Sequence, residues 1–506
     1  ICVYIVTWNV STKYPDNISV TNLLGLDKNP LNDQHQPDFY VIGLQEVNSQ
    51  PQNVVIGLFR DDPWTNRFKD VLKERDYVAV KSEHLQGMLL ILFAKRKHLL
   101  HIRDIETEYT RTGFGGFWGN KGAISIRLNI YGCGVTFVNS HLAAHDHQLN
   151  ERIEDYNQIL KFHHYHVGRF RQIFDHDYVF WFGDLNFRLE NRKTPEEVRR
   201  DVQEDRLKEL LEDDQLQLVR NLGKAFYQLE ERPPSFPPTF KFEHGTSEYD
   251  MKRKPAWTDR ILYRVKTDAY NNVALNIEQL SYKSHPGYNI SDHKPVTSEF
   301  VLKVRYLDTF RNSDFGKITN QTNYFSITRN SDLEITFFDF DLDESDALKY
   351  PKKPKTLSVD TDLFDSTDAQ VFDDPAEKTV EFAYIPKWLI GEENIIEYTM
   401  PADFEEQSGD WIGVYKSDFN SLGEYIAYEY TNQEDRKSPR LGEAGRNIRR
   451  SIRLEFSESI DLKAGESYIL LYFQSTGIRG VTSLTGMSNV FQAEKRPPSP
   501  RFEAVD

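Results

Sequence analysis

Short apolar segments that end abruptly on acids, amides or imidazoles recur along roughly the first 300 residues of this chain. In one of them, "YVFWFGDLNF" (residues 178–187), an aromatic-rich segment leads into Asp184 and Asn186. Side chains two residues apart on a strand point the same way, so this pair would face one pocket. Gly183 removes a side chain where another group must approach the backbone closely. The alternative explanation is an Asx turn that simply ends the strand.

Other predicted strands and tight turns end in the same manner. Their polar residues are Asn9, Glu46, Asn139, His141, Asp259, Arg260, Asp292 and His293. Such groups are seldom fully buried unless they are paired or bind a ligand. Any one of them could be a cap or a turn, but that explanation does not suit the whole set. If the strands share one end of a sheet, these residues meet in one cleft.

The residue types in this set favour a hard cation. Oxygens of Glu, Asp and Asn suit Mg²⁺. A zinc site is not indicated, because Cys2 and Cys133 lie far apart and the sequence contains no HExxH motif. One Mg²⁺, an Asp–Asn pair and two histidines fit the hydrolysis of a phosphate ester.

Composition limits the remaining possibilities. The formal net charge of −16 argues against non-specific binding of nucleic acid, so an anionic substrate needs a local basic pocket. Two cysteines in 506 residues exclude a disulfide framework and favour a reducing compartment. The sequence contains neither an apolar run long enough to span a bilayer nor a secretory signal. It begins inside an apparent strand without a methionine, so we expect further residues ahead of it.

The patterning divides the chain into four parts. Residues 1–305 alternate strands and helices, which predicts an α/β protein with two packed sheets. Residues 306–379 are acidic and contain proline and serine, so we expect a partly disordered linker or insertion, although "LEITFFDFDL" (333–342) has the pattern of a strand. Residues 380–495 predict a small β-sandwich, followed by a tail at 496–506. We expect the linker to let the sandwich move, and a chain ending near Arg305 to fold alone.

Several motifs together resemble one enzyme family. The motifs are "TWNV", "GLQEV", "WGNKGAISI", "NSHLAAH", "FWFGDLNFR", "PAWTDRILYR" and "SDHKPV". In order and spacing they resemble the inositol polyphosphate 5-phosphatases over roughly 300 residues. The resemblance implies the four-layered α/β sandwich of the DNase I and exonuclease III-like fold. The C-terminal segments "DWIGVYK" and "YILLYF" resemble a SKICH domain, which indicates the SKICH-containing branch of the family.

The resemblance implies Mg²⁺-dependent removal of the 5-phosphate from phosphoinositides, such as phosphatidylinositol 4,5-bisphosphate and 3,4,5-trisphosphate, and also from soluble inositol polyphosphates. Partners would be phosphoinositide lipids at a membrane surface and an unknown protein bound by the SKICH-like domain, but no nucleic acid. The protein would be cytoplasmic and peripheral at the plasma membrane or an endomembrane. Two alternatives are another phosphodiesterase of the same fold, such as a nuclease or sphingomyelinase, and a catalytically weak phosphoinositide-binding adaptor.

Matching positions imply roles for individual residues. Asp184 would position or deprotonate the attacking water, and Asn186 would hold phosphoryl oxygens. The catalytic set is Asp184, Asn186, His141, Asp259 and His293, with the last two as an oriented pair that contacts the scissile phosphate. The metal-binding set is Glu46, Asn9 and Asp292. The substrate-binding set is Asn120, Lys121, Lys241, Lys252 and Arg253.

One stretch departs from the family pattern. The family usually reads Pro-Pro-Thr-Tyr-Lys before a basic cluster, whereas this chain reads "PPTFKFEHGTSEYDMKRKPAW". Phe240 therefore lacks a hydroxyl donor, and Met251 stands where a lysine is common. These differences predict intact catalysis but weaker recognition of a 4-phosphate.

Three further motifs have competing interpretations. "GFGGFWGNKG" (113–122) is either a flexible hairpin or a loop whose aromatic residues enter a membrane interface while Lys121 meets phosphate. "HHYH" (163–166) is predicted to face solvent from a polar helix. "RNIRRSIR" (446–453) is either a solvated basic face or a contact for anionic lipid.

Overall fold

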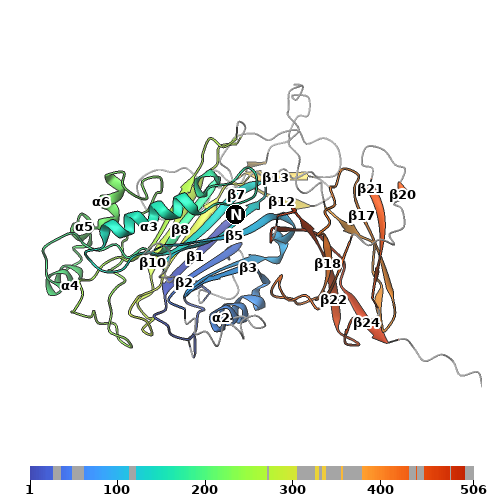
Figure 1. Cartoon of the computed structure of the whole chain (residues 1–506), viewed down its shortest axis with the longest axis horizontal. Coiled ribbons are helices and arrows are strands. Elements are labelled where there is room, and N and C mark those ends of the chain that lie inside the picture. Colours follow the sequence, from blue (N-terminus) through green and yellow to red (C-terminus); the bar gives the residue numbers. More distant parts are fainter. Residues whose placement is uncertain are drawn as a thin grey trace, which may run out of the picture. The chain divides into compact units, whose positions relative to one another are not determined.

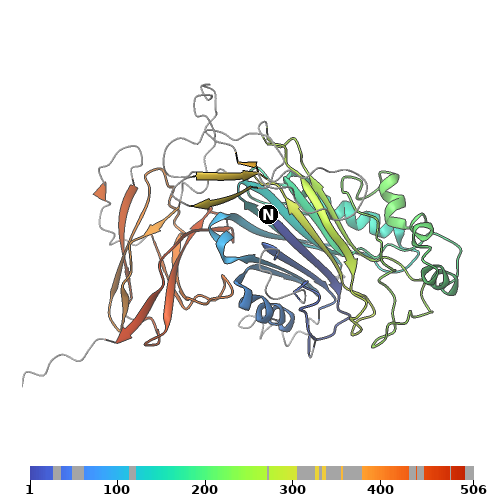
Figure 2. The ribbon, with the colours of Figure 1, turned by 180° about the vertical axis from the view of Figure 1, so that it is seen from behind.

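The structure is a computed structural model that describes most of the chain. It covers residues 1–16, 18–26, 36–47, 62–112, 121–270, 273–304, 379–431, 449–457, 459–478 and 480–495, together with the backbone of four short strands at 325–329, 333–337, 355–356 and 440–441. Residues 1–306 and 374–506 form one unit, and residues 307–373 form a second. Figures 1 and 2 show the chain from opposite sides.

The first sheet of the larger unit has six strands in the order β10-β11-β1-β2-β4-β3. They are β1 (Cys2–Asn9), β2 (Phe39–Gln45), β3 (Tyr77–Leu85), β4 (Met88–Lys95), β10 (Ile277–Ser284) and β11 (Val296–Leu302). β1 and β2 are parallel, and their outer neighbours β11 and β4 are antiparallel to them. All of β2 is buried, which explains its continuous apolar run, because a strand covered on both faces has no solvent side.

The second sheet places five strands side by side in chain order. They are β5 (Ile102–Arg111), β6 (Gly122–Ile130), β7 (Cys133–His141), β8 (Tyr178–Asp184) and β9 (Asp259–Val265). β7 and β8 are parallel, whereas the other neighbours are antiparallel. β8 is buried from end to end, including the aspartate that finishes it.

Helices cover the outer faces of both sheets, while their inner faces share one apolar core. The helices are α2 (Pro63–Leu72), α3 (Leu149–Phe162), α4 (Pro195–Gln203), α5 (Leu207–Leu211) and α6 (Gln215–Asn221), with 3-10 turns η2 (Lys73–Arg75), η3 (Arg96–His101) and η5 (Ile173–Asp175). α2 packs Trp64 and Phe68 on the first sheet. α3 and α6 pack Tyr156 and Leu216 on the second. The layer order helix, sheet, sheet, helix confirms the predicted four-layered sandwich (Figure 1).

The C-terminal region is a β-sandwich with a core of its own, as predicted. Its strands are β15 (Glu381–Phe382), β16 (Lys387–Ile390), β17 (Asn394–Pro401), β18 (Trp411–Lys416), β19 (Ala427–Tyr430), β20 (Arg440–Leu441), β21 (Arg449–Phe456), β22 (Ser467–Ser475), β23 (Thr482–Met487) and β24 (Phe491–Lys495). One sheet has the order β15-β17-β21-β20. The other contains β16-β24-β22-β23, with β18 on β22 and β19 on β18.

This sandwich contacts the N-terminal region through backbone as well as side chains. Thr482 of β23 pairs with Ile105 of β5. Ala79 donates its N–H to the carbonyl of Asn420 at 2.8 Å and accepts from the N–H of Leu422 at 3.0 Å. The core between the two N-terminal sheets includes Tyr415, Phe419, Ile469, Leu471, Phe473 and Leu484. Shared hydrogen bonds and a shared core differ from our expectation of a freely moving tethered domain.

The smaller unit contains an antiparallel sheet of β12 (Phe325–Arg329), β13 (Leu333–Phe337) and β14 (Lys355–Thr356). β13 confirms the candidate strand at the start of "LEITFFDFDL". Most of the predicted linker at 306–379, and the tail at 496–506, lie outside the described residues.

The prediction that "HHYH" faces solvent is wrong for two of its four residues. α3 ends at Phe162, and the following backbone is extended, so side chains alternate between inside and outside. His163 and Tyr165 are buried, whereas His164 and His166 are exposed. His163 bonds the hydroxyls of Thr110 and Ser125 at 2.9 and 2.7 Å.

The described arginines of "RNIRRSIR" are bound to their own domain. Arg449 donates to the carbonyl of Thr379 at 2.8 Å, and Arg450 donates to the carbonyl of Phe404 at 2.6 Å. Arg453 of β21 pairs with Glu397 of the neighbouring strand β17. These contacts favour a structural role over lipid binding. Arg446 lies outside the described residues.

Candidate active site

Strand pairing in the second sheet places three predicted site residues in one row. His141, the last residue of β7, pairs with Asp184, the last residue of β8. Asp184 in turn pairs with Asp259, the first residue of β9. Because β9 runs antiparallel to β8, its start lies beside the end of β8. One edge of the sheet therefore carries an imidazole and two carboxylates side by side.

The first sheet contributes to the same edge through Asn9 and Glu46, which end β1 and follow β2. The amide nitrogen of Asn9 donates to Oε1 of Glu46 at 3.1 Å and to Oδ2 of Asp184 at 3.0 Å. Its Oδ1 accepts from the N–H of Ser11 at 2.9 Å. One amide thus joins carboxylates that come from two different sheets.

Asp184 is the centre of this cluster. The residue is only 1% exposed, and its Oδ2 lies 3.4 Å from Nε2 of His141 and 3.8 Å from Nε2 of His293. Burial opposes ionisation, but the charge of His293 and the hydrogen bond from His141 outweigh it and hold the pKa of Asp184 well below its ordinary value. The carboxylate therefore stays ionised.

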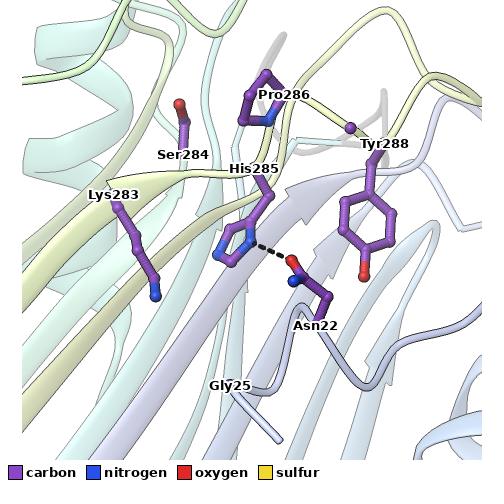
Figure 3. A pocket seen from close by; sticks show the side chains of 8 residues that line it. Asn22, Gly25, Lys283, Ser284, His285, Pro286 and Tyr288 are labelled. Atoms are coloured by element: carbon purple, nitrogen blue, oxygen red, sulfur yellow. Dashed lines mark hydrogen bonds between the residues drawn. The ribbon is translucent and has the colours of Figure 1, made fainter. Parts of the chain in front are cut away.

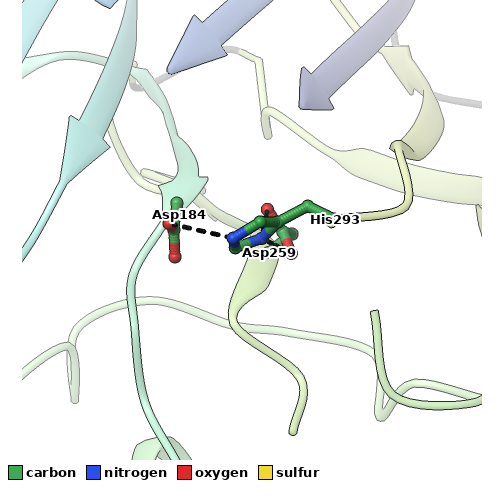
Figure 4. A group of neighbouring side chains, drawn as sticks. All are labelled: Asp184, Asp259 and His293. Carbon is green, nitrogen blue, oxygen red and sulfur yellow. Dashed lines mark hydrogen bonds and ion pairs between the residues drawn. The ribbon is translucent and has the colours of Figure 1, made fainter. Parts of the chain in front are cut away.

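His293 is oriented by a second carboxylate, as Figure 4 shows. Its Nδ1 lies 2.9 Å from Oδ2 of Asp259, which also accepts from the hydroxyls of Thr239 and Thr258 at 2.7 and 2.9 Å. Burial disfavours the imidazolium, but the charges of Asp259 and Asp184 raise the pKa of His293 to about 9. The imidazole is therefore protonated at neutral pH, with Nε2 turned towards Asp184.

Asp184, Asp259 and His293 also form a buried cluster that could hold a metal ion, since their ligand atoms lie within 4.8 Å of one another. Asp259 is already bonded by two hydroxyls and the imidazole. Asp184 and Glu46 instead accept hydrogen bonds from the same amide nitrogen of Asn9. The side chain of Glu46 is 43% exposed, so an ion can reach it. Glu46 and Asp184 therefore offer two carboxylates at one point, with Nε2 of His141 3.9 and 3.4 Å from them.

The turn after β8 is built for close packing. Gly183 has a φ of +140°, and a Cβ there would lie 1.9 Å from the carbonyl oxygen of Ser140. Asn186 adopts a φ of 58°, a conformation that asparagine tolerates better than most residues. Its amide donates to the carbonyl of Leu142 at 3.1 Å. The turn holds Asp184 at the shared edge through the N–H of Asn186, which donates to Oδ1 of Asp184 at 3.1 Å.

Arg188 is a site residue that the sequence analysis did not single out, although it ends the motif "WFGDLNFR". Its Nε and Nη2 donate to the backbone and side-chain oxygens of Asn186 at 3.0 and 2.6 Å. The guanidinium lies 4.4 Å from the ring centre of Phe240, whose ring lies 4.4 Å from that of His293. Nη1 is buried and has no hydrogen-bond partner among the described residues. An unpartnered buried donor in this position suits an anionic ligand.

Lys121 reaches the same edge from the start of β6. Its Nζ contacts Nε2 of His141. Burial lowers the pKa of Lys121, while the charges of Asp184 and Glu46 oppose that shift. Burial and the charge of Lys121 together lower the pKa of His141. Asn120 lies outside the described residues, as do the aromatic residues of the preceding loop.

The other three predicted substrate-binding cations are arranged less closely. Nζ of Lys241 lies 3.2 Å from Oδ2 of Asp292, so this lysine sits beside the cluster. Lys252 and Arg253 are exposed in a turn, where their backbone N–H groups bond to Asp250 at 3.0 and 3.1 Å. The side chains of this turn remain available to a ligand.

A separate pocket of about 260 Å³ lies between the end of β10 and the loop that contains Asn22 (Figure 3). His285 in this pocket bonds Thr297 at 2.8 Å, and its contact to Asn22 is 3.4 Å. Burial and Lys283 lower the pKa of His285 to about 4, so it is neutral. The ring of Tyr288 packs on Trp8 at 5.4 Å. These contacts fasten the loop that leads to Asp292 and His293.

Comparisons with known proteins show which families this chain resembles. A family model described as Endonuclease/Exonuclease/phosphatase family 2 matches residues 6–299, and a SKICH domain model matches residues 380–493. The chain is 34% identical over 441 residues to human phosphatidylinositol 4,5-bisphosphate 5-phosphatase A, which covers 85% of this chain but only 37% of that protein. It is 32% identical over 441 residues to mouse inositol polyphosphate 5-phosphatase K, covering 84% of this chain and 78% of that protein.

Among solved structures, the inositol polyphosphate 5-phosphatase domain of SPsynaptojanin, in complex with inositol (1,4)-bisphosphate and calcium ion, is 34% identical. The match has a TM-score of 0.49 and covers 60% of this chain and 85% of that one. Every helix in the described part of the chain is too short or too polar to cross a membrane.

Proposed function

The chain belongs to the inositol polyphosphate 5-phosphatase family and carries a SKICH domain, and from this premise we propose that it hydrolyses the 5-phosphate of phosphoinositides. Phosphatidylinositol 4,5-bisphosphate and 3,4,5-trisphosphate are the proposed lipid substrates, and soluble inositol polyphosphates are a further class. One observation carries the proposal: Asp184 is buried and ionised where strands of both sheets end, in contact with Asn9, His141 and His293.

In the proposed mechanism, Asp184 accepts a hydrogen bond from the attacking water and aligns it with the phosphorus atom. The low pKa of this carboxylate makes it a poor proton acceptor, so we assign it to orientation rather than to strong base catalysis. That assignment suits phosphoryl transfer, in which a loose transition state depends mainly on positioning and electrostatics.

The cations around Asp184 would meet the negative charge of the phosphoryl group. Protonated His293, held by Asp259, faces the centre through Nε2. Arg188 offers the unpartnered Nη1, and Asn186 is held in place by the same guanidinium. Preorganised donors of this kind commonly contribute about 10²–10³-fold each.

The oxygen-rich part of the cluster fits Mg²⁺. Glu46 and Asp184 both contact the Asn9 amide nitrogen, so two carboxylates converge there, and Nε2 of His141 lies 3.9 and 3.4 Å from the same two oxygens. We place Glu46 and Asp184 as the ligands, with Asn9 fixing their separation. Asp292 faces Lys241, and we place it with the substrate-binding residues instead. When bound, Mg²⁺ would polarise the phosphoryl group.

Lys241, Lys252 and Arg253 are proposed to bind a 4-phosphate. Lys241 contacts Asp292, next to His293, and the other two stand in an exposed turn. Phe240 supplies a ring between Arg188 and His293 but no hydroxyl. We therefore expect a 4-phosphate to add less affinity here than in relatives with tyrosine at this position.

Two alternatives are less well supported. A nuclease would need a basic surface, whereas the net charge is −16. A catalytically weak adaptor would not need Asp184, His293 and Arg188 assembled around one point. For location, we propose that the protein is cytoplasmic and acts at the plasma membrane or an endomembrane, with an unidentified protein bound by the SKICH domain.

The decisive test is phosphate release across a panel of phosphoinositides that differ only in phosphate position. We expect release from lipids with a 5-phosphate and little from those phosphorylated only at positions 3 or 4. Binding without release by the native chain would favour the adaptor. Cleavage of a phosphodiester substrate instead would favour another enzyme of the same fold.

A further inference from the structure

Four aromatic side chains of the SKICH domain line a pocket of about 210 Å³ that lies apart from the candidate active site. They are Trp411 of β18, Tyr428 and Tyr430 of β19, and Tyr425 from the preceding turn. The three tyrosines remain 44–51% exposed, so solvent reaches the pocket. A group of exposed aromatic residues at one point commonly marks an interaction site, whereas single exposed aromatic residues scattered over a surface need no explanation.

The rings stand nearly at right angles to one another. Trp411 meets Tyr425 at 66° and Tyr428 at 74°, with ring centres 5.6 and 5.8 Å apart. Tyr428 meets Tyr425 at 87° and Tyr430 at 89°, both at 5.5 Å. Perpendicular rings form the walls of a box, whereas a groove for a proline-rich peptide needs aromatic ridges that run alongside one another.

Packing and hydrogen bonds hold the aromatic side chains of this pocket in place. Trp411 stacks on Phe473 at 4.2 Å and 11°. Gly413 leaves the space that this indole occupies, since a Cβ there would lie 2.7 Å from the ring. The turn before Tyr425 is tied on both sides, because Leu422 donates to Ala79 and accepts from the hydroxyl of Tyr415 at 2.8 Å. Because these side chains are already held in place, little conformational entropy would be lost when a ligand binds.

The chemistry of the walls indicates the ligand. The faces of Trp and Tyr rings carry negative potential and attract cations, particularly quaternary ammonium groups. The domain around the pocket is acidic, with 18 acidic and 11 basic residues between positions 380 and 492. The pocket is smaller than the roughly 300 Å³ at which sites for drug-sized ligands begin, so it suits a single small group.

We propose that this pocket binds the trimethylammonium group of choline, and that its source is phosphatidylcholine in the membrane that carries the substrate. The choice of source rests on the proposed function, because phosphoinositides lie in bilayers whose zwitterionic lipids the SKICH domain would then contact. Binding here would keep the enzyme at the bilayer independently of phosphoinositide in the active site.

The test is sedimentation of the full chain with vesicles free of phosphoinositide. We expect binding to phosphatidylcholine vesicles that exceeds binding to phosphatidylethanolamine vesicles, and competition by choline but not by its neutral isostere 3,3-dimethylbutan-1-ol. Tyr428→Ala with Tyr430→Ala should weaken phosphatidylcholine binding by about tenfold. Replacing the same two residues by Phe, or the 78% exposed Tyr384 by Ala, should leave it unchanged.

Phosphate release from a soluble short-chain substrate is measured on the same samples. It should be equal in all variants, which separates this proposal from the proposed catalytic function. Equal binding to both kinds of vesicle, equal competition by the neutral isostere, or preferential capture of a trimethyl-lysine or proline-rich peptide would overturn the choline assignment.

Discussion

Asp184 and Asp410 are both buried aspartates next to strands, but they have different surroundings. Asp184 contacts the amide of Asn9 from β1, the imidazole of His141 from β7, and the imidazole of His293 from the loop before β11. Asp410 accepts from the N–H of Ser475 at 2.8 Å and the hydroxyl of Tyr472 at 3.0 Å, both in its own sandwich. Burial raises the pKa of Asp410, whereas nearby cationic groups lower that of Asp184.

The difference separates a chemical role from a structural one. Neutral donors satisfy Asp410 and close off its oxygens, so the residue serves to fasten strands together. Asp184 is surrounded by groups that carry or accept protons, at an edge where Glu46 remains 43% exposed. The same residue type therefore predicts catalysis only when convergent strands surround it with charge.

Metal removal should have the largest effect. We expect EDTA to reduce phosphate release by the catalytic region to background and Mg²⁺ to restore it, because two carboxylates converge at Asn9. Glu46→Gln should require more Mg²⁺ for half-maximal activity, while Asp410→Asn should leave that requirement unchanged. Rescue by Zn²⁺ alone would contradict the choice of metal.

Asp184→Asn should lower kcat by about 10²–10⁴-fold, because it removes the charge that orients water and holds two imidazoles. The matched change Asp410→Asn should lower the thermal midpoint with little effect on kcat. Rates measured on a soluble short-chain substrate, alongside calorimetry, distinguish the two. Near-normal turnover by Asp184→Asn would remove the basis for the assignment.

The junction between the regions makes a prediction about stability. Phe473 belongs to the core between the N-terminal sheets, so Phe473→Ala should cost about 3–5 kcal/mol and lower the temperature at which activity is lost. Phe491→Ala, in the sandwich's own core, is the matched change. A chain ending near Arg305, which the sequence predicts to fold alone, should be less stable than the full chain. If Phe473→Ala loses activity at the same temperature as the unsubstituted chain, the two regions unfold independently.

Arg188→Ala should reduce kcat/KM by about 10–100-fold, since hydrogen bonds to charged groups contribute about 1.5–3 kcal/mol. Arg188→Lys should recover only part of this, because an ammonium cannot replace a fork that holds Asn186 twice. Phe240→Tyr is the companion variant, and we expect it to improve KM for substrates with a 4-phosphate. A wild-type rate in Arg188→Ala would exclude contact with the phosphoryl group.

The smallest expected effect concerns pH. Burial, with a contribution from His164, lowers the pKa of His163 to about 3, so the folded state holds this residue neutral. The unfolded chain takes up its proton near pH 6.5, so stability is lost as pH falls below that value towards the folded pKa. Between pH 7.5 and 5, His163 should lower the free energy of unfolding by about 2 kcal/mol. In chemical denaturation, the variant His163→Gln should lose most of this pH dependence. The exposed neighbour His164 is the control, because burial is the larger cause of the shift and His164→Gln should change the slope only slightly.

Much of the fold and the site could be predicted from local pattern. Apolar strands interrupted by helices predicted two packed sheets, the family resemblance implied the four layers, and polar residues at strand ends predicted a shared edge. The motif "FWFGDLNFR" ends on Arg188 and so offered a signal for this residue, but its contact with Phe240 depends on a segment about 50 residues away in the sequence. His163 was misassigned because a helix boundary changes which side chains face inward, and boundaries are weakly encoded.

The contact between the N-terminal region and the C-terminal sandwich could not be predicted from the sequence. A linker-like composition at 306–379 indicated separate domains, but the contact between Ala79 and Asn420 and the pairing of Ile105 with Thr482 depend on segments more than 300 residues apart. By itself, the sequence determined the strands, the family and the residue types of the site, because these depend on local periodicity and on motifs. Only the tertiary structure decided that one amide joins Glu46 to Asp184 and that four aromatic rings enclose a pocket, because such contacts depend on which strands pair and in which register.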